Sequence, residues 1–337
     1  MLNSAIINLN NLRYNAKKIR QILDKDTKFC AVVKADAYGH GACEVASAIY
    51  DLVDLFAVAL VEEGVELKRA GIKKDILVLI PPFKCDLERA VRFGLTLSVS
   101  DEKTIMLIDK EAKRQKKIIK VHLKVDTGMN RQGVKDLDEI DRLCAKISCC
   151  KNLELEGIFS HFANPQNKKS LNSALDKFLL ANKVVKGYNN KVISHISASG
   201  GLLTGVQMDM VRVGIMLYGY TPFKTDKIHL KPVMKVVAPV IKTQTLKRGE
   251  VALYGDKRVK KTGSYSLIRY GYADGLERKN ATFQHGNRCM DLTLVKSNGK
   301  NAHVILSDAE ILAKEYKTIT YEILCKAPIR AERKYRR

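Results

Sequence analysis

The sequence contains no tryptophan, and its 7 prolines and 21 glycines among 337 residues are not an enrichment. With 46% hydrophobic and 28% charged residues, this composition excludes a disordered, collagen-like or low-complexity protein. No apolar run approaches the roughly 18 residues of a membrane-spanning helix. The first residues also lack the apolar stretch and the cleavage site of a secretory signal, so we expect a cytoplasmic protein with no membrane partner.

Metal-ligand patterns are missing as well. The 8 cysteines form no Cys-x-x-Cys pair, and no group of cysteine and histidine has the spacing of a zinc site. We therefore expect no metal centre. Without a secretory signal, the cysteines are typical of reduced thiols in a cytosol.

Negative charge is scarce relative to positive charge. Lys and Arg number 59 and Asp and Glu 36, which gives a net charge of +23. Such an excess first suggests a nucleic acid or an anionic membrane as partner. However, no helix-turn-helix, zinc-finger or RRM pattern accompanies it, and the basic residues are scattered over expected helix faces and loops. We therefore expect no nucleic-acid partner.

The first two thirds of the chain alternate short apolar runs with helical patterns. Helices are expected over Glu62–Ala70, Lys103–Gln115 and Leu137–Ile147. Eight such βα units favour an α/β fold built as a (β/α)8 TIM-type barrel, with a doubly wound sheet as the alternative. The expected strands are Phe29–Lys34, Leu55–Leu60, Asp75–Ile80, Leu95–Ser98, Ile119–Val125, Leu155–His161, Val192–Ser197 and Met210–Leu217.

The pattern changes near residue 228, where strands follow one another without long helical intervals. Several of these segments alternate apolar and polar residues, as half-exposed antiparallel strands do. We therefore expect a barrel over residues 1–227 and a smaller, mainly β domain over 228–337, to which Ala5–Leu9 could add a strand. The expected strand segments are VMKVVAPVIKTQTL, GEVALYG, SYSLIRYGYADGL, RCMDLTLVK and AHVILS.

Lys34 stands on or just past the first barrel strand, where active-site residues of such barrels lie. An apolar run precedes it, and loss of hydration lowers the pKa of a lysine and makes its amine a nucleophile for aldehydes. This is what a Schiff base with pyridoxal 5'-phosphate requires. A solvated lysine at the end of a strand is the alternative interpretation.

The residues around Lys34 and a series of later segments resemble one known family, the alanine racemases. The resemblance starts at VKADAYGHG (33–41) and continues in order over nearly the whole chain, which favours a pyridoxal phosphate enzyme. The later segments are KVDTGMNRQGV (124–134), EGIFSHFA (156–163), HISAS (195–199), MVRVGIMLYG (210–219), LYG (253–255), GYADG (271–275), RCMDLT (288–293) and TYEILC (320–325).

The resemblance implies racemisation of alanine by two acid/base groups on opposite faces of the substrate, Lys34 and Tyr254. A free phenol ionises near pH 10, so nearby positive charge would have to favour the phenolate. The resemblance also implies a role in supplying D-alanine for peptidoglycan.

The same resemblance assigns the remaining site residues. Arg212 would face the pyridine nitrogen, which would stay largely unprotonated because an arginine does not give up its proton. His161 would lie near the ring and support Arg212. The phosphate would be bound by Tyr38, Ser199, Gly214, Ile215 and Tyr321.

Arg131 would clamp the substrate carboxylate with its planar guanidinium. Met290 would donate a backbone N–H to the same carboxylate, Tyr272 would line the site and Asp291 would support it. Lys124 matches a family position that is often carbamylated.

Several of these residues belong to the β domain, whereas Lys34 belongs to the barrel. The family joins the two groups in a head-to-tail homodimer whose sites are each completed by the partner chain, and we predict the same. The chain departs from the family at Ala198, Val213 and Leu292, and it is short in the β domain. These departures affect no proposed acid/base group.

Other functions remain open at this point. A serine or broad-spectrum racemase would use the same residues, and an amino acid decarboxylase of related architecture would use the same cofactor. A cofactor carrier without turnover is a further alternative, but such small barrel proteins lack the β domain.

Overall fold

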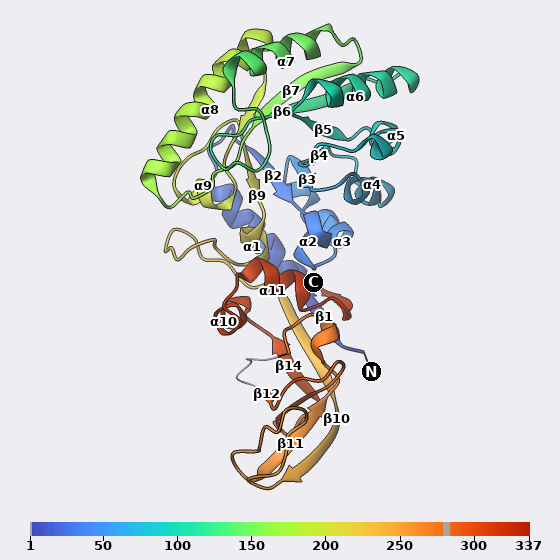
Figure 1. Cartoon of the computed structure of the whole chain (residues 1–337), viewed down its shortest axis with the longest axis vertical. Helices are drawn as coiled ribbons and strands as arrows, with labels where there is room; N and C mark the ends of the chain where they lie inside the picture. The colour runs from blue at the N-terminus through green and yellow to red at the C-terminus, as the bar shows by residue number, and fades with distance from the viewer. Residues whose placement is uncertain (1, 279–283) are drawn as a thin grey trace.

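The computed structural model of the protein describes residues 2–278 and 284–337. It contains an eight-stranded sheet and a seven-stranded sheet. The two sheets occupy opposite parts of an elongated molecule (Figure 1). Within the described ranges, no helix combines the length and the apolar character needed to cross a membrane.

The eight-stranded sheet is parallel throughout and curls into a nearly closed barrel. Its order is β8-β7-β6-β5-β4-β3-β2-β9, and the backbone N–H of Arg212 donates to Ser197 O at 3.0 Å where β9 approaches the segment after β8. All eight expected barrel strands are therefore confirmed. They are β2 (Lys28–Val32), β3 (Leu55–Val58), β4 (Ile76–Val78), β5 (Thr96–Val99), β6 (Ile119–Lys124), β7 (Leu153–Phe159), β8 (Ile193–His195) and β9 (Met210–Val213).

Amphipathic helices connect these strands and cover the outside of the barrel. The side chains of Asp101, Asp136 and Asn167 cap three of them by accepting a backbone N–H of the first turn. The three helices expected from the sequence are present within two residues of their expected bounds. The helices are α1 (Leu9–Ile22), α3 (Ala42–Ala48), α4 (Val61–Arg69), α5 (Leu87–Arg92), α6 (Glu102–Arg114), α7 (Leu137–Cys149), α8 (Lys168–Tyr188) and α9 (Ser199–Leu203).

The second sheet is assembled from the two ends of the described chain. Strand β1, near the start of the chain, pairs antiparallel with β10 and parallel with β15. Residues far apart in sequence therefore lie side by side. The order is β12-β13-β11-β10-β1-β15, and β14 also pairs with β10. The strands are β1 (Ser4–Asn8), β10 (Met234–Leu246), β11 (Gly263–Ile268), β12 (Gln284–His285), β13 (Thr293–Lys296), β14 (Ala302–Leu306) and β15 (Glu332–Arg336).

Two expectations for this part of the chain need correction. GEVALYG is not a continuous strand, because Gly249, Leu253 and Gly255 have positive φ angles, and only isolated bridges form there. Two short helices, α10 (Ala309–Glu315) and α11 (Thr320–Lys326), follow β14 where no helix was expected.

The segment after β2 has an unusual backbone. The short helical turn α2 (Lys34–Tyr38) lies largely in the left-handed region, with φ between 51° and 54° from Ala35 to Tyr38. Such a conformation costs roughly 1–2 kcal/mol per residue, so its surroundings must hold it. Glu63 accepts from the Ala35 N–H at 2.6 Å, and Asp36 accepts from the Ala42 N–H at 2.7 Å.

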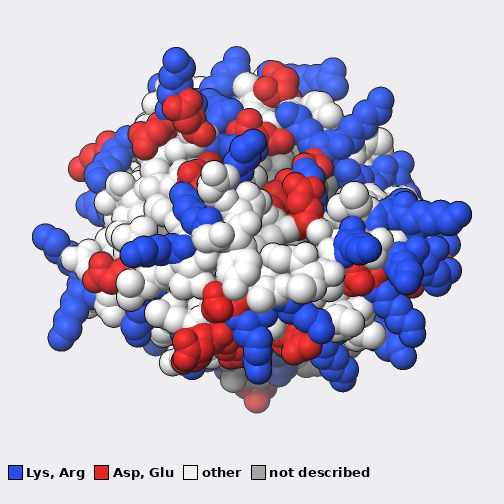
Figure 2. Space-filling view, turned by 90° about the horizontal axis from the view of Figure 1, so that it is seen from above, with Lys and Arg blue, Asp and Glu red and all other residues white. Residues whose placement is uncertain are grey.

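Surface charge is mixed on the face seen in Figure 2. Lys and Arg are spread around this face, and Asp and Glu lie between them rather than on a separate surface. The eight cysteines are unpaired; Cys30, Cys144 and Cys150 are buried, and the other five are half-buried or exposed.

Candidate active site

Lys34 lies two residues after the end of β2 and is half-buried at the carboxyl end of the barrel. Burial lowers the pKa of its amine, and the positive charges of Arg131 and Arg212 lower it further. The left-handed turn that starts here fixes the backbone on which the amine is carried. The structure therefore gives Lys34 the properties of a nucleophilic amine.

Lys34, Lys124, Arg131 and Arg212 form a cationic cluster at this end of the barrel. Burial and the charges of the other three cations lower the pKa of Lys124 to about 8. Burial and the same four cations lower the pKa of His161 to about 3, so the histidine is neutral at pH 7. Such a cluster suits an anion that carries more than one negative charge.

Arg212, on β9, is buried and donates to backbone oxygens of two neighbouring segments. Its Nη1 donates to His195 O at 2.9 Å, and its Nη2 donates to Ser160 O at 2.6 Å and Ile196 O at 3.1 Å. The Nη2 atom also lies 3.4 Å from His161 Nδ1. Burial lowers the pKa of Arg212 to about 10, which still leaves the guanidinium charged at neutral pH.

Lys124, at the end of β6, is held in a defined position. Its Nζ donates to Leu79 O at 2.9 Å and to Gln132 Oε1 at 2.5 Å, and it lies 5.3 Å from the centre of the Phe159 ring. Gln132 follows Arg131 in the loop after β6, so Lys124 ties this loop to the barrel.

The loop that carries Arg131 is organised by one carboxylate. Asp126 accepts backbone N–H groups of Gly128, Asn130 and Arg131 at 2.8, 3.1 and 3.1 Å. These bonds lower the pKa of Asp126 against the opposing effect of burial. The Arg131 side chain is exposed, and it is available to an anionic ligand.

The residues expected to bind phosphate converge between α2, α9 and β9. The Gly214 N–H donates to Ser199 Oγ at 3.3 Å, and the rings of Tyr38 and Tyr321 lie 5.9 Å apart. A Cβ atom on Gly214 would lie 2.5 Å from the Tyr38 hydroxyl, so only glycine leaves this space open. Ile215 follows at the start of a short 3-10 helix, η3 (Ile215–Tyr218).

Tyr272, Met290 and Asp291 lie together in the β domain. The Tyr272 N–H donates to Cys289 O at 3.0 Å, and the Ala273 N–H donates to Met290 O at 3.0 Å. Asp291 forms an ion pair with Arg330 at 2.8 Å. The side chains of all three site residues are exposed.

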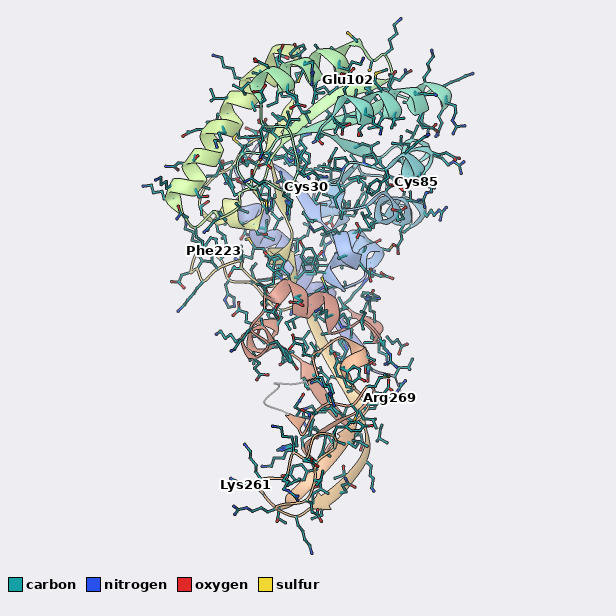
Figure 3. The ribbon with its side chains drawn as sticks, viewed as in Figure 1. Cys30, Cys85, Glu102, Phe223, Lys261 and Arg269 are labelled. Carbon is teal, nitrogen blue, oxygen red and sulfur yellow. The ribbon has the colours of Figure 1, made fainter. Side chains whose placement is uncertain are left out.

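Tyr254 belongs to the loop between β10 and β11, and its side chain is 61% exposed. Figure 3 labels Lys261, in the same loop, at the far end of the molecule, and Cys30, on the strand that leads to Lys34, within the barrel. The loop that carries Tyr254 thus extends to the end of the molecule away from the strand that leads to Lys34.

The three departures from the family pattern lie next to site residues. Ala198 forms an isolated parallel β-bridge with Arg212, where the barrel closes between β8 and β9. Val213 is buried in β9 beside Gly214. Leu292 accepts the Cys289 N–H at 2.8 Å, which closes the turn that presents Met290 and Asp291.

Sequence reasoning missed two buried histidines. His195 lies against Arg212, with its Nδ1 at 2.6 Å from the Nη1 atom, and His122 lies 2.8 Å from His195. The available signal was a histidine inside each of two apolar strand segments, IKVHLKV and VISHIS, where an unpaired polar side chain is unfavourable.

Comparison with known families and structures agrees with this architecture. A family model described as alanine racemase, N-terminal domain, matches residues 7–222, and one described as alanine racemase, C-terminal domain, matches residues 233–335. The alanine racemase of Treponema denticola is 34% identical over 95% of this chain and 94% of its own length. That of Aquifex aeolicus is 32% identical over 97% of each chain.

Solved structures give the same result. The alanine racemase of Clostridium difficile 630 superimposes with a TM-score of 0.94 at 30% identity, covering 100% of this chain and 96% of that chain. A complex of the same enzyme with cycloserine gives a TM-score of 0.90 at 30% identity, covering 99% and 96%. The chain therefore belongs to the alanine racemase family of isomerases.

Proposed function

We propose that the protein uses pyridoxal 5'-phosphate to interconvert L- and D-alanine. The observation that carries the proposal is Lys34, with its lowered pKa, within a cluster of cations beside the Tyr38–Ser199–Gly214 cradle. An amine nucleophile, an open glycine position and surrounding positive charge suit an aldehyde that carries a phosphate. Family membership supports the same conclusion.

The residues present fit this cofactor. Lys34 would hold its aldehyde carbon, and Tyr38, Ser199, Gly214, Ile215 and Tyr321 would bind its phosphate. When bound, pyridoxal phosphate supplies a conjugated ring that delocalises the negative charge left at the substrate Cα. His161, which burial keeps neutral, would lie near the ring and support Arg212.

Arg212 would face the ring nitrogen of the cofactor. Its hydrogen bonds to Ser160 O, His195 O and Ile196 O fix the guanidinium, and it remains a cation at neutral pH. A guanidinium donates a hydrogen bond without giving up its proton, so the ring nitrogen would stay largely unprotonated. This weaker electron sink would limit competing reactions such as transamination.

Two groups would move the Cα proton on opposite faces of the substrate. Lys34 would be one of them, taking up and returning the proton at Nζ. Tyr254 is the other, supplied by the partner chain of a head-to-tail homodimer. Its exposure in the separate β domain supports this arrangement. The division into a barrel over 1–227 and a β domain over 228–337 is part of the proposal.

The substrate carboxylate would be held from both chains. Arg131 would clamp it, Met290 would add a backbone N–H, Tyr272 would line the site and Asp291 would support it from the domain interface. Lys124 would orient Arg131 through the loop that Gln132 anchors, either as an amine or after carbamylation. We further propose that the enzyme acts in the cytoplasm and supplies D-alanine for peptidoglycan.

The decisive experiment is incubation of the purified, cofactor-loaded protein with L-alanine or L-serine in deuterated water. We expect D-alanine that carries deuterium at Cα. Faster exchange of serine would instead support a serine or broad-spectrum racemase, and release of carbon dioxide would support a decarboxylase. Borohydride reduction should attach the cofactor to the peptide that contains Lys34, and protein that binds no pyridoxal phosphate would contradict the proposal.

A further inference from the structure

A continuous series of hydrogen-bonded side chains leads away from Arg212 through the barrel. Arg212 Nη1 lies 2.6 Å from His195 Nδ1, His195 Nε2 lies 2.8 Å from His122 Nδ1, and His122 Nε2 lies 3.1 Å from Glu156 Oε2. The side chains of Arg212, His195 and His122 are buried. They come from β9, β8 and β6, and Glu156 comes from β7 between them in the barrel.

The strand next to His122 leaves room for this arrangement. Gly157 pairs with His122 across β6 and β7, and a Cβ atom at Gly157 would lie 2.5 Å from the imidazole ring. The His195 ring stacks on Phe159 with an interplanar angle of 1°, which fixes its plane. Both rings are therefore held by the barrel and not only by their hydrogen bonds.

Only one set of proton positions satisfies every hydrogen bond from Arg212 to Glu156. Arg212 has no acceptor, so His195 Nδ1 must accept, and the His195 proton then lies on Nε2. His195 Nε2–H donates to His122 Nδ1, and His122 Nε2–H donates to the carboxylate of Glu156. Every hydrogen bond thus points from Arg212 toward Glu156, and both imidazoles are neutral.

The charges at both ends agree with this direction. Burial and the charge of Arg212 lower the pKa of His195 well below its ordinary value, which keeps it neutral. Burial opposes ionisation of Glu156, but hydrogen bonds from His122 and Lys120 lower its pKa to about 2. The second carboxylate oxygen of Glu156 lies 2.7 Å from Lys120 Nζ. The series of hydrogen bonds therefore ends on an anion, the carboxylate of Glu156.

We propose that Glu156, acting through His122 and His195, is a positioning residue for Arg212. This inference rests on the proposed function, in which Arg212 faces the ring nitrogen of the cofactor. Arg212, which only donates, and the Glu156 carboxylate, which only accepts, fix both imidazole tautomers from the two ends, so the lone pair of His195 Nδ1 faces Arg212 and orients its guanidinium. Glu156 also borders a cleft of about 600 Å³ at the amino ends of β2, β7 and β8. The electronic environment of the ring nitrogen would therefore depend on a residue outside the active site.

The proton positions can be measured without cofactor or turnover. In full-length protein labelled with ¹⁵N-histidine, long-range ¹H–¹⁵N spectra at neutral pH should show His122 and His195 as neutral Nε2–H tautomers. His122→Gln and His195→Gln assign the two signals. A cationic ring or an Nδ1–H tautomer at either position would overturn the proposal.

Glu156→Met tests the role of the carboxylate, because it removes the acceptor of the His122 Nε2–H while keeping a side chain of similar length. We expect loss of the single tautomer at His122 and, in cofactor-loaded protein, a shifted visible absorption band. Glu154→Met is the matched control, because Glu154 lies on the same strand, is exposed and borders the same cleft. Glu156→Asp should restore part of the wild-type pattern.

The outcomes separate this inference from the proposed function. Unchanged tautomers and an unchanged absorption band in Glu156→Met would overturn the positioning role. If the protein shows the expected tautomers but binds no pyridoxal phosphate, the series of hydrogen bonds from Arg212 to Glu156 is supported and the proposed function is contradicted.

Discussion

Arg333 and Asp36 form an ion pair of 2.5 Å that joins β15 to the left-handed turn carrying Lys34. Arg333 Nε also donates to Gly39 O at 2.9 Å, at the end of the same turn. Asp36 in turn accepts the Ala42 N–H. A backbone conformation that is unfavourable for L-residues is thus held from a strand of the other sheet.

Replacement of Arg333 should therefore affect the cofactor site as well as stability. Because both side chains are partly exposed, we expect Arg333→Ala to lower the free energy of unfolding by about 1 kcal/mol. We also expect weaker binding of pyridoxal phosphate, measured by titration of the visible absorption band. Arg336→Ala, at an exposed position of the same strand, should change neither quantity. Equal effects of the two variants would contradict this role.

The two groups of site residues predict complementation between inactive chains. Lys34→Ala and Tyr254→Phe should each abolish or cripple exchange of the Cα proton, the latter unequally in the L and D directions. If each site combines Lys34 of one chain with Tyr254 of the other, unfolding and refolding an equal mixture restores about a quarter of wild-type activity. Activity that stays at the level of the separate variants would place both residues in one chain.

Gly214 offers a test of the phosphate cradle. The added Cβ of Gly214→Ala would meet the Tyr38 hydroxyl, so we expect a loss of about 1–3 kcal/mol from strain, shared between stability and cofactor affinity. Equilibrium dialysis with pyridoxal phosphate and urea unfolding measure the two parts. Gly187→Ala is the matched control, because a Cβ there meets no atom within 4 Å. It should leave cofactor affinity unchanged.

Because the pKa of Lys124 is lowered, we expect the free energy of unfolding to depend on pH. Its pKa falls from 10.5 to about 8 on folding, so between these values the unfolded chain binds the proton and the folded chain does not. The contribution of Lys124 to stability therefore rises with pH across this window, by about 3 kcal/mol. The difference between wild type and Lys124→Met in urea unfolding at pH 7.5 and 10.5 isolates this contribution.

Carbamylation of Lys124 would be detected directly as a ¹³C signal on the protein in ¹³C-bicarbonate. In protein without this signal, a stability difference that does not vary with pH would contradict the lowered pKa.

The barrel could be predicted from the sequence because buried parallel strands are short apolar runs. FCAVVK and MVRVGIML are examples that the structure confirms as β2 and β9. The left-handed turn after Lys34 could not be predicted, since Ala35 and Ala37 normally avoid that region, and contacts from Glu63 and Arg333 hold it. The basic segment of β15 has too few apolar residues to indicate a strand.

The sequence names candidate site residues, but it does not show how they are divided in space. Order along the chain places Tyr254 after the barrel without showing that the loop lies away from Lys34. The chain from Arg212 to Glu156 was missed because its histidines are spaced by sheet pairing, which a linear pattern does not contain. Both failures concern contacts between residues that are distant in sequence.

The position of β1 between β10 and β15 has a consequence for synthesis on the ribosome. β1 leaves the ribosome well before its two neighbours, which are both more than 220 residues downstream. At about 5–20 residues per second, β1 waits roughly 10–45 s for β10 and still longer for β15. During that interval its two edges are unpaired, so this strand is the segment that we expect a chaperone to bind on the nascent chain.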